Sequence, residues 1–178
     1  AASDVYKRQP TTRALAAIAT GDKVFRNTVE PGAVMVRVAK SHLRFGSIQY
    51  LAMTRDGDGL AELVEYAAER HFAEILSAKS AESTSTKAEV LLEETVKRIA
   101  WLVAHWQSLG FVHGVMNTDN MLLSGETIDY GPCAFVDTFK ADAVFSAIDS
   151  QGRYRLSNQP GIAHWNTCLL YTSDAADD

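Results

Sequence analysis

The fold is decided by one stretch, His113-Gly114-Val115-Met116-Asn117-Thr118-Asp119-Asn120, together with the residues that follow it. Next come Met121-Leu122-Leu123, a turn at Ser124-Gly125, and Thr127-Ile128, a pattern that predicts a short β-hairpin. The triplet Asp129-Tyr130-Gly131 ends this hairpin. The sequence therefore places Asp119 and Asn120 on a loop and Asp129 one hairpin further along.

The catalytic region of protein kinases has the same order of features: a helix, a His at the first loop position, an Asn at the eighth, a hairpin and an Asp-aromatic-Gly triplet. His113 and Asn120 have this spacing. The order predicts an α+β, protein-kinase-like fold. At the third loop position, where a kinase has its catalytic Asp, the chain has Val115, which cannot accept a proton. Val115 therefore disfavours an ordinary kinase reaction.

Three side chains of this segment offer oxygen atoms for nucleotide chemistry. Magnesium prefers hard oxygen ligands and usually shares them between one or two protein groups and nucleotide phosphates. The amide oxygen of Asn120 and the carboxylate of Asp129 supply such a pair, and Gly131 is expected to let the backbone bend after them. Asp119 remains as the candidate base for a hydroxyl nucleophile. His113 is more simply a structural residue that hydrogen-bonds the loop.

A long amphipathic helix leads into the loop. Thr86 and Glu89 have capping-box spacing, which predicts that the helix begins there. Gly110 stands where helix C-caps prefer glycine. The apolar stripe between these ends consists of Ala88, Leu91, Leu92, Thr95, Ile99, Leu102, Val103 and Trp106.

Two arginines lie further upstream. Between Pro10 and Phe45, two apolar runs flank Glu30-Pro31-Gly32, which predicts a β-hairpin or two neighbouring strands with a turn there. In the second run Val34, Val36 and Val38 alternate with Met35, Arg37 and Ala39, so Arg37 faces away from the valines. Arg44 follows the predicted strand. Taken without further evidence, the residues favour a strand-edge salt bridge for Arg37 and a solvated loop charge for Arg44 over a binding role.

Another helix is predicted between these parts. It follows the loop Asp56-Gly57-Asp58-Gly59, and a linker from Ser77 to Ser85 separates it from the long helix. Its apolar face consists of Leu60, Leu63, Val64, Ala67, His71 and Ile75, which makes His71 a partly buried packing residue. Trp101, Trp106 and Trp165 are interpreted as core or groove packing.

Composition and charge exclude several classes of protein. Of 178 residues, 47% are hydrophobic and 22% charged, as in ordinary globular proteins. A net charge of -5 argues against non-specific binding to nucleic acid or anionic membranes. Cys133 and Cys168 form neither a disulfide framework nor a zinc motif, so a reducing compartment is expected. We find no apolar stretch of membrane-spanning length and no signal-peptide core.

The segment from Gly110 to Met121 closely resembles the signature of the selenoprotein O family, also called the YdiU family. The resemblance extends from about Pro10 to Asn166. The other matching words are Pro10-Thr11-Thr12-Arg13-Ala14-Leu15, Glu30-Pro31-Gly32-Ala33, Ser41-His42-Leu43-Arg44-Phe45-Gly46, Asp129-Tyr130-Gly131-Pro132, Gln151-Gly152-Arg153-Tyr154 and Asn158-Gln159-Pro160.

The resemblance implies a pseudokinase fold that binds ATP in an inverted orientation and transfers AMP to Ser, Thr or Tyr hydroxyls of proteins. It implies that Asp119 is the proton acceptor and that Asn120 and Asp129 hold the metal. It also implies that Arg37 and Arg44 contact the nucleotide phosphates, a role that suits the fixed donors of guanidinium groups. We therefore expect Mg²⁺, with Mn²⁺ as an alternative, ATP as substrate and hydroxyl-bearing proteins as partners.

The resemblance also divides the chain. Residues 10–50 correspond to the end of the kinase-like N-lobe, and residues 51–167 to part of the helical C-lobe. Residues 1–9 and 168–178 have no regular period and are expected to be non-native, adapter-derived tails, or else frayed termini. The family's glycine segment, strand lysine and helical glutamate, and its C-terminal redox cysteines, have no counterpart here. We expect an incomplete, inactive fragment.

Departures from the family pattern are few. Cys133 stands at a usually aromatic position, and Ser146-Ala147-Ile148 replaces a more polar segment. A kinase-type phosphotransferase and a catalytically silent pseudokinase scaffold remain open as alternatives. Bacterial members of the family are cytoplasmic and eukaryotic members mitochondrial, so the compartment depends on the source organism.

Overall fold

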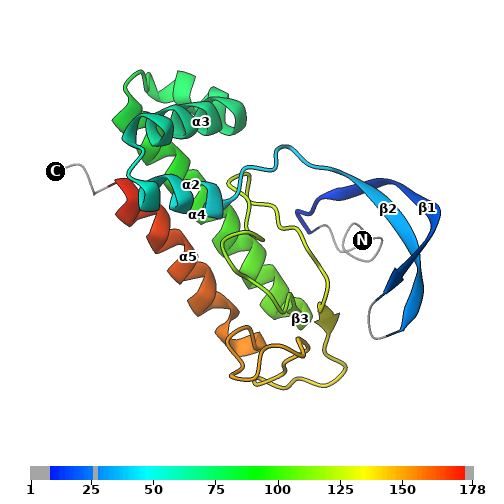
Figure 1. The fold of residues 1–178 in the computed structure, drawn as a ribbon. Coiled ribbons are helices and arrows are strands. Elements are labelled where there is room, and N and C mark those ends of the chain that lie inside the picture. Colours follow the sequence, from blue (N-terminus) through cyan, green and yellow to red (C-terminus); the bar gives the residue numbers. More distant parts are fainter. Residues whose placement is uncertain (1–8, 26–27, 175–178) are drawn as a thin grey trace.

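The computed structural model describes residues 9–25 and 28–174, with side chains described up to residue 170. The chain is α+β: helices pack together on one side, a long β-hairpin projects on the other, and an irregular segment joins them (Figure 1). The helices are α2 (Phe45–Thr54), α3 (Gly57–Lys79), α4 (Thr84–Leu109), the short 3-10 helix η1 (Leu156–Asn158) and α5 (Gln159–Asp174). The strands are β1 (Arg13–Phe25), β2 (Val29–Val38), β3 (Phe111–Val112) and β4 (Ala134–Phe135).

Strands β1 and β2 pair antiparallel, as predicted, but the predicted turn is wrong. Pro31 pairs with Lys23 and Ala33 with Ala19, so Glu30-Pro31-Gly32 lies inside β2, at a bulge. An added Cβ at Gly32 would lie 2.9 Å from Thr20 Oγ1, which explains the glycine. Proline and glycine mark bulges as well as turns, so the local sequence did not distinguish the two.

Helices α3 and α4 follow the predicted apolar stripes. The carboxylate of Asp56 caps α3 by accepting the backbone N–H of Gly59 at 3.0 Å. Helix α4 begins at Thr84 rather than Thr86, because Ser83 is the N-cap and accepts the N–H of Thr86 at 3.2 Å. The linker is consequently shorter than predicted. Gly110 ends α4 with a φ of 64°, as predicted.

Helix α2 has no counterpart among the predicted elements, since it lacks a capping side chain at Arg44. Its first backbone N–H groups bind carbonyls that are far away in the sequence: Phe45 N–H donates to Met121 O and Gly46 N–H to Thr118 O, both at 3.0 Å. The first described helix therefore begins at Phe45, within the range of residues 10–50 that was expected to end the N-lobe.

Part of the expected C-terminal tail is helical in the structure. Helix α5 continues to Asp174, and the side chain of Leu170 is buried in the core, so residues 168–174 are helical rather than irregular. Residues 1–8 of the expected N-terminal tail lie outside the described residues. In the described part of the chain, no helix combines the length and apolarity that crossing a membrane requires.

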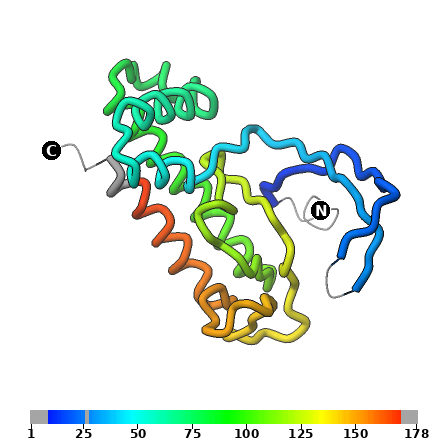
Figure 2. The backbone as a smooth tube through the Cα atoms, in the orientation of Figure 1, coloured from blue at the N-terminus to red at the C-terminus, as the bar shows by residue number. Residues whose placement is uncertain are grey.

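Within the described residues, the core lies between α2, α3, α4 and α5 and the loop that follows α4. Trp106 is fully buried and packs against Phe111 and His113, with ring centroids 5.2 and 5.6 Å apart. Trp101 and Trp165 are 53% and 46% exposed, so their predicted packing role holds only for part of each ring. Residues 41–44 run beside residues 121–123 (Figure 2), where Leu123 N–H donates to Leu43 O at 2.9 Å.

Candidate active site

His113 fixes the start of the loop after α4. Its Nδ1 accepts the backbone N–H of Val115 at 3.3 Å, so the proton belongs on Nε2, which lies 3.1 Å from Ile128 O and donates to it. The ring is fully buried between Trp106 and Tyr130. The structural interpretation of His113 is confirmed, and no proton-transfer role is needed for it.

Two amides on α5 support the same loop. Gln159 is fully buried; its Oε1 accepts His113 N–H and its Nε2 donates to Phe111 O, both at 2.9 Å. Asn166, two helical turns further along, donates from Nδ2 to Met116 O at 2.9 Å. Sequence analysis assigned neither Gln159 nor Asn166 to the site. The available signal was two amides seven positions apart, which places them on one helix face.

The predicted hairpin after the loop is confirmed. Met121 pairs with Thr127, Leu122 N–H donates to Glu126 O at 3.1 Å, and Ile128 N–H donates to Asn120 O at 3.3 Å. Because Asp129 follows Ile128 directly, the hairpin brings its backbone close to that of Asn120. Helix α4 holds the far end of the hairpin, where Thr95 Oγ1 donates to Leu123 O at 3.0 Å.

Asn120 presents its amide in one orientation. Its side chain is 5% exposed, and Nδ2 donates to Val115 O at 2.8 Å. Among the described residues, no donor is hydrogen-bonded to its Oδ1. The loop therefore uses the amide nitrogen of Asn120 for its own structure and leaves the amide oxygen available to a ligand.

Asp129 makes the sharp backbone bend itself. Its φ is 66°, in the left-handed region that non-glycine residues seldom adopt, whereas Gly131 does not have a positive φ. The expectation that Gly131 supplies the bend is therefore wrong. Asp and Asn tolerate this conformation better than other residues with a side chain, and the Asp129 side chain is exposed. The bend thus presents a carboxylate to solvent beside the loop.

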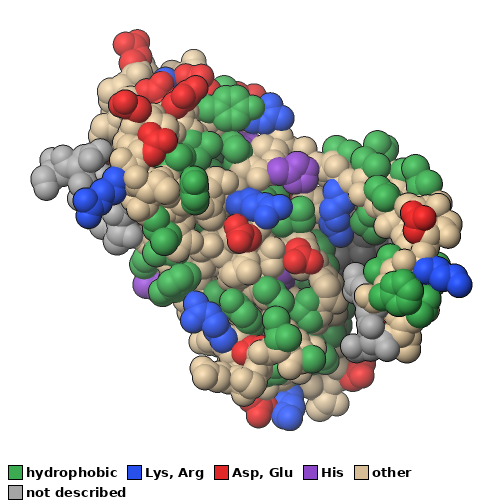
Figure 3. Space-filling view, viewed as in Figure 1, with side chains coloured by type: hydrophobic (Ala, Val, Ile, Leu, Met, Phe, Trp, Pro, Cys, Tyr) green, Lys and Arg blue, Asp and Glu red, His purple; other side chains and the backbone are tan. Residues whose placement is uncertain are grey.

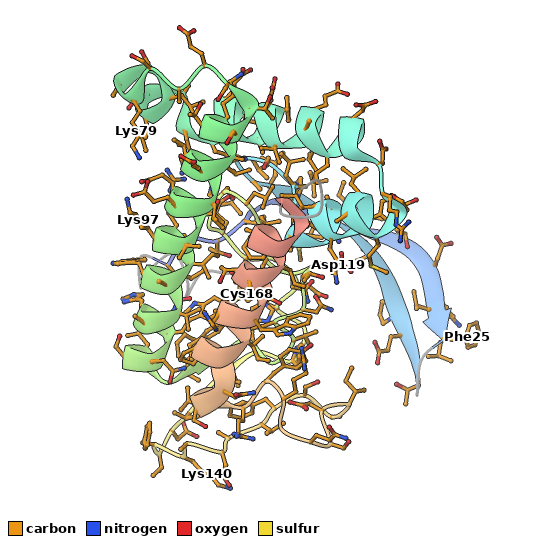
Figure 4. All side chains as sticks on the ribbon, turned by 90° about the vertical axis from the view of Figure 1, so that its left-hand side faces the viewer. Phe25, Lys79, Lys97, Asp119, Lys140 and Cys168 are labelled. Atoms are coloured by element: carbon orange, nitrogen blue, oxygen red, sulfur yellow. The ribbon has the colours of Figure 1, made fainter. Side chains whose placement is uncertain are left out.

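Asp119 and Arg44 line one open pocket on the surface. Its other lining residues are His42, Gly46, Ser47, Tyr50 and Leu51. Asp119 lies beside α2 (Figure 4), and the pocket that it lines is formed by α2 and the residues that lead into it. A Cβ at Gly46 would overlap Asp119 Oδ1, so the carboxylate can hold its present position against the first turn of α2 only while residue 46 is glycine. In Figure 3, acidic, basic and histidine side chains gather on this part of the face.

Arg37 approaches the site from β2. Its Nη1 donates to the buried Thr12 Oγ1 at 2.6 Å, and its Cζ lies 6.0 Å from the ring centroid of Tyr130. The side chain is half-buried, whereas Val34, Val36 and Val38 on the opposite face are exposed. The predicted alternation of β2 is confirmed, and Arg37 lies on the face turned toward the Asp129-Tyr130-Gly131 triplet.

The connection between β2 and α2 is anchored on α3. Arg70 donates from Nε and Nη2 to Lys40 O at 3.1 and 2.7 Å, and His71 Nε2 lies 2.8 Å from Ser41 Oγ. His71 is half-buried, as predicted. Burial, with smaller contributions from Arg70, Arg98 and Lys40, lowers the pKa of His71 to about 4. A neutral ring can therefore pair with Ser41 and hold the segment that carries Arg44.

The oxygen donors present fit a hard divalent cation that is shared with phosphates. Asn120 offers an unused amide oxygen and Asp129 an exposed carboxylate, both hard ligands of the kind magnesium prefers. Within the described ranges, no group of three His, Cys, Asp or Glu side chains could form a cation site by itself. One or two protein ligands are usual where phosphates and waters complete the coordination of magnesium.

Comparison with known proteins identifies the family. The family model of protein adenylyltransferase SelO matches residues 8–174. The chain belongs to the SelO family. Its relatives include the protein nucleotidyltransferases YdiU of Bacillus cytotoxicus and Shouchella clausii, which are 52% identical over 164 residues and 54% identical over 157 residues. These matches cover 92% and 88% of this chain but 32% and 31% of the relatives, so the chain spans about a third of their length.

The structure brings the five predicted site residues of this SelO-family chain into two adjoining groups. Asp119 and Arg44 share a pocket at α2, while Arg37 lies near Tyr130, next to Asp129. Asn120 links the groups, because it follows Asp119 in the chain and pairs with Ile128 through its backbone. The roles assigned to these residues remain predictions.

Proposed function

We propose that the protein containing this chain is a Mg²⁺-dependent protein adenylyltransferase that transfers AMP from ATP to Ser, Thr or Tyr hydroxyls. One observation carries the proposal: the hydrogen bond from Ile128 N–H to Asn120 O brings the two predicted metal ligands to the same end of one hairpin. Family membership supports a nucleotidyl transfer reaction.

We also propose that the fold is of the protein-kinase type. The order of a long helix, a loop with His113 first and Asn120 eighth, a short hairpin and Asp129-Tyr130-Gly131 supports it. In this proposal residues 10–50 end the N-lobe and residues 51–167 belong to the C-lobe. The chain alone is expected to lack turnover, because the glycine segment, strand lysine and helical glutamate of the kinase-like N-lobe are not in it.

The proposed reaction joins the acceptor hydroxyl oxygen to the α-phosphorus of ATP. Asp119 accepts the hydroxyl proton, the bond between the α-phosphorus and the bridging oxygen breaks, and pyrophosphate leaves. Arg37 and Arg44 hold phosphate oxygens through charge-assisted hydrogen bonds. Asn120 and Asp129 would hold the metal, which when bound neutralises charge on the phosphates. Val115 takes no part, which is consistent with a base at Asp119 instead.

The experiment is mass spectrometry of the full-length gene product after incubation with ATP and Mg²⁺. A covalent gain of AMP on protein is expected, with loss of the gain in Asp129→Ala and Asn120→Ala. Asp142→Ala is the matched control, because Asp142 is an exposed acid on another loop, and it should retain transfer. ATP labelled separately at the α- and γ-phosphates distinguishes the alternatives: a retained γ-label would indicate a phosphotransferase. ATP binding without any transfer would indicate a silent scaffold.

ATP and hydroxyl-bearing proteins are the proposed partners, without nucleic acid or membrane. The net charge of -5 supports the exclusion of non-specific anionic partners. The named relatives are bacterial, which favours a cytoplasmic location over the mitochondrial alternative. Fractionation of the source organism with an antibody against the full-length protein would test this.

A further inference from the structure

The guanidinium of Arg153 lies over two aromatic rings at the surface, those of Trp165 and Tyr154, which we call the aromatic shelf. Its Cζ lies 5.1 Å from the ring centroid of Trp165 and 5.7 Å from that of Tyr154. The side chain is exposed, and among the described residues none of the ion pairs involves it. Stacking on ring faces leaves the N–H edge of a guanidinium free to bind a planar anion with two hydrogen bonds.

The loop that carries Arg153 is braced through its backbone. The carboxylate of Asp149 accepts the N–H groups of Arg153 and Tyr154, both at 2.8 Å. Asn158 Nδ2 donates to Arg153 O at 2.5 Å. Asp149 is thus engaged with the backbone, so the positive charge of Arg153 is presented outward in a fixed position. Little side-chain entropy remains to be lost when an anion binds.

Helix α5 connects this arginine to the candidate active site. Trp165, which forms the shelf, precedes Asn166, which donates to Met116 O in the loop of Asp119. The loop around Arg153 lies at the start of α5, at the same end of the molecule as β3 (Figure 1). One helix therefore holds both the loop of the candidate base and the shelf of Arg153, which fixes their relative positions.

The surface beside Arg153 suits a polypeptide better than a free anion. Ile148, next to the bracing Asp149, is 87% exposed, and Val144 is 38% exposed. Val144 lies against Gly152, where its Cγ2 is 3.6 Å from the position of an added Cβ. An unpaired cation next to exposed apolar side chains matches a segment that combines acidic and apolar residues.

We propose that Arg153 binds the carboxylate of an acidic residue in the acceptor protein, within the segment that carries the hydroxyl to be modified. The inference rests on the proposed function and names its substrate class: acceptor segments with Asp or Glu near the modified residue. Arg37 and Arg44 serve the nucleotide phosphates, whereas Arg153 serves the acceptor.

The binding test uses the full-length gene product and two fluorescent Ser-containing peptide pools, identical except for Glu or Gln at the positions flanking Ser. Fluorescence anisotropy should show about two- to fivefold tighter binding of the Glu pool, the range expected for an exposed ion pair. Arg153→Gln should remove the preference and Arg153→Lys should retain part of it. Lys140→Gln, which removes an exposed charge near this loop, is the matched control and should leave the preference unchanged.

The shelf is tested separately from the charge. Trp165→Phe keeps a ring under the guanidinium and should preserve the preference for Glu, whereas Trp165→Leu should weaken it. In AMP transfer, Arg153→Gln should raise the KM for Glu-containing acceptors with little change in kcat. Thermal unfolding of each variant shows whether it is folded.

Two outcomes would overturn the inference: an undiminished Glu preference in Arg153→Gln, or an equal loss in Lys140→Gln. Failure of the proposed function is distinguishable from both. If the wild type transfers no AMP to either pool, the adenylyltransferase proposal fails, while the anisotropy comparison still decides the role of Arg153.

Discussion

At the scale of single residues, His71 makes the stability of the segment that carries Arg44 depend on pH. Its pKa of about 4 in the folded protein lies below the ordinary value of 6.5, so the folded state disfavours the protonated ring. The contribution of the neutral His71 ring to the free energy of unfolding is therefore complete above pH 6.5, and it is lost as the pH falls toward 4. Because the ring is half-exposed, solvent screening reduces the effect to about 1 kcal/mol.

His71→Gln should remove this contribution. Glutamine does not titrate and can still reach Ser41, so its free energy of unfolding should decline less between pH 7 and pH 4 than that of the wild type. Urea denaturation at several pH values measures both curves. Parallel curves for the two proteins would show that His71 is protonated equally easily in the folded and unfolded states.

The five site residues differ in how far the sequence could anticipate their setting. The spacing of Asn120 and Asp129 predicted the hairpin that joins them, since both ends of a two-strand turn are local in the chain. The bend at Asp129 was assigned to Gly131, because composition alone favours glycine at such a position. Gln159 and Asn166 were missed as supports because their partners lie 46 to 50 residues away.

At the scale of the elements, the first turn of α2 must both form a helix and leave space for the Asp119 carboxylate. Gly46 leaves space for the carboxylate of Asp119, and its N–H binds Thr118 O at 3.0 Å. Alanine would favour the helix by about 0.5–1 kcal/mol relative to glycine, but its Cβ would displace Asp119. Alanine at position 46 is therefore expected to stabilise the helix and to lower the activity.

Gly46→Ala should therefore lower the rate of AMP transfer at least tenfold in the full-length protein without lowering the melting temperature. The reason is that the Asp119 carboxylate changes position, whereas helix α2 stays folded. Transfer rates and thermal melts measure the two effects, and Gly161→Ala, at an exposed glycine of α5, is the control. Unchanged transfer in Gly46→Ala would show that the position of the Asp119 carboxylate against α2 does not limit the reaction.

Element boundaries were predictable where the signals are local. Gly110 correctly marked the end of α4, because a left-handed C-cap requires glycine or a similar residue. The start of α4 was misplaced by two residues, since Ser83 and Thr86 are both acceptable caps. Helix α2 was missed because carbonyls of a distant loop, rather than a neighbouring side chain, satisfy its first amides.

At the scale of the whole molecule, the β1–β2 hairpin exposes apolar side chains. Ile18 and Val34 are cross-strand partners and are 60% and 55% exposed. Exposed apolar strands favour association with other chains. The fold class followed from local patterns, whereas this exposure depends on which elements cover the hairpin, and the local pattern does not contain that information.

Replacing both partners, Ile18→Thr with Val34→Thr, should reduce aggregation of the isolated chain several-fold. Threonine keeps the β-branched shape, so the strand pairing should persist while the apolar surface decreases. Static light scattering at increasing concentration measures the effect, with the exposed Val96→Thr on α4 as the control. Equal scattering by the double variant and the wild type would mean that the hairpin does not drive association.

The amide bridge from Gln159 to His113 also bears on the order of folding. It joins residues 46 positions apart, whereas α3 and α4 are neighbours along the chain. Closing so long a segment carries an entropic cost before any contact compensates for it, so we expect the α3–α4 pair to form early and the loop of Asp119 to become ordered last. A φ-value near one for Gln159→Ala in stopped-flow refolding would contradict this order.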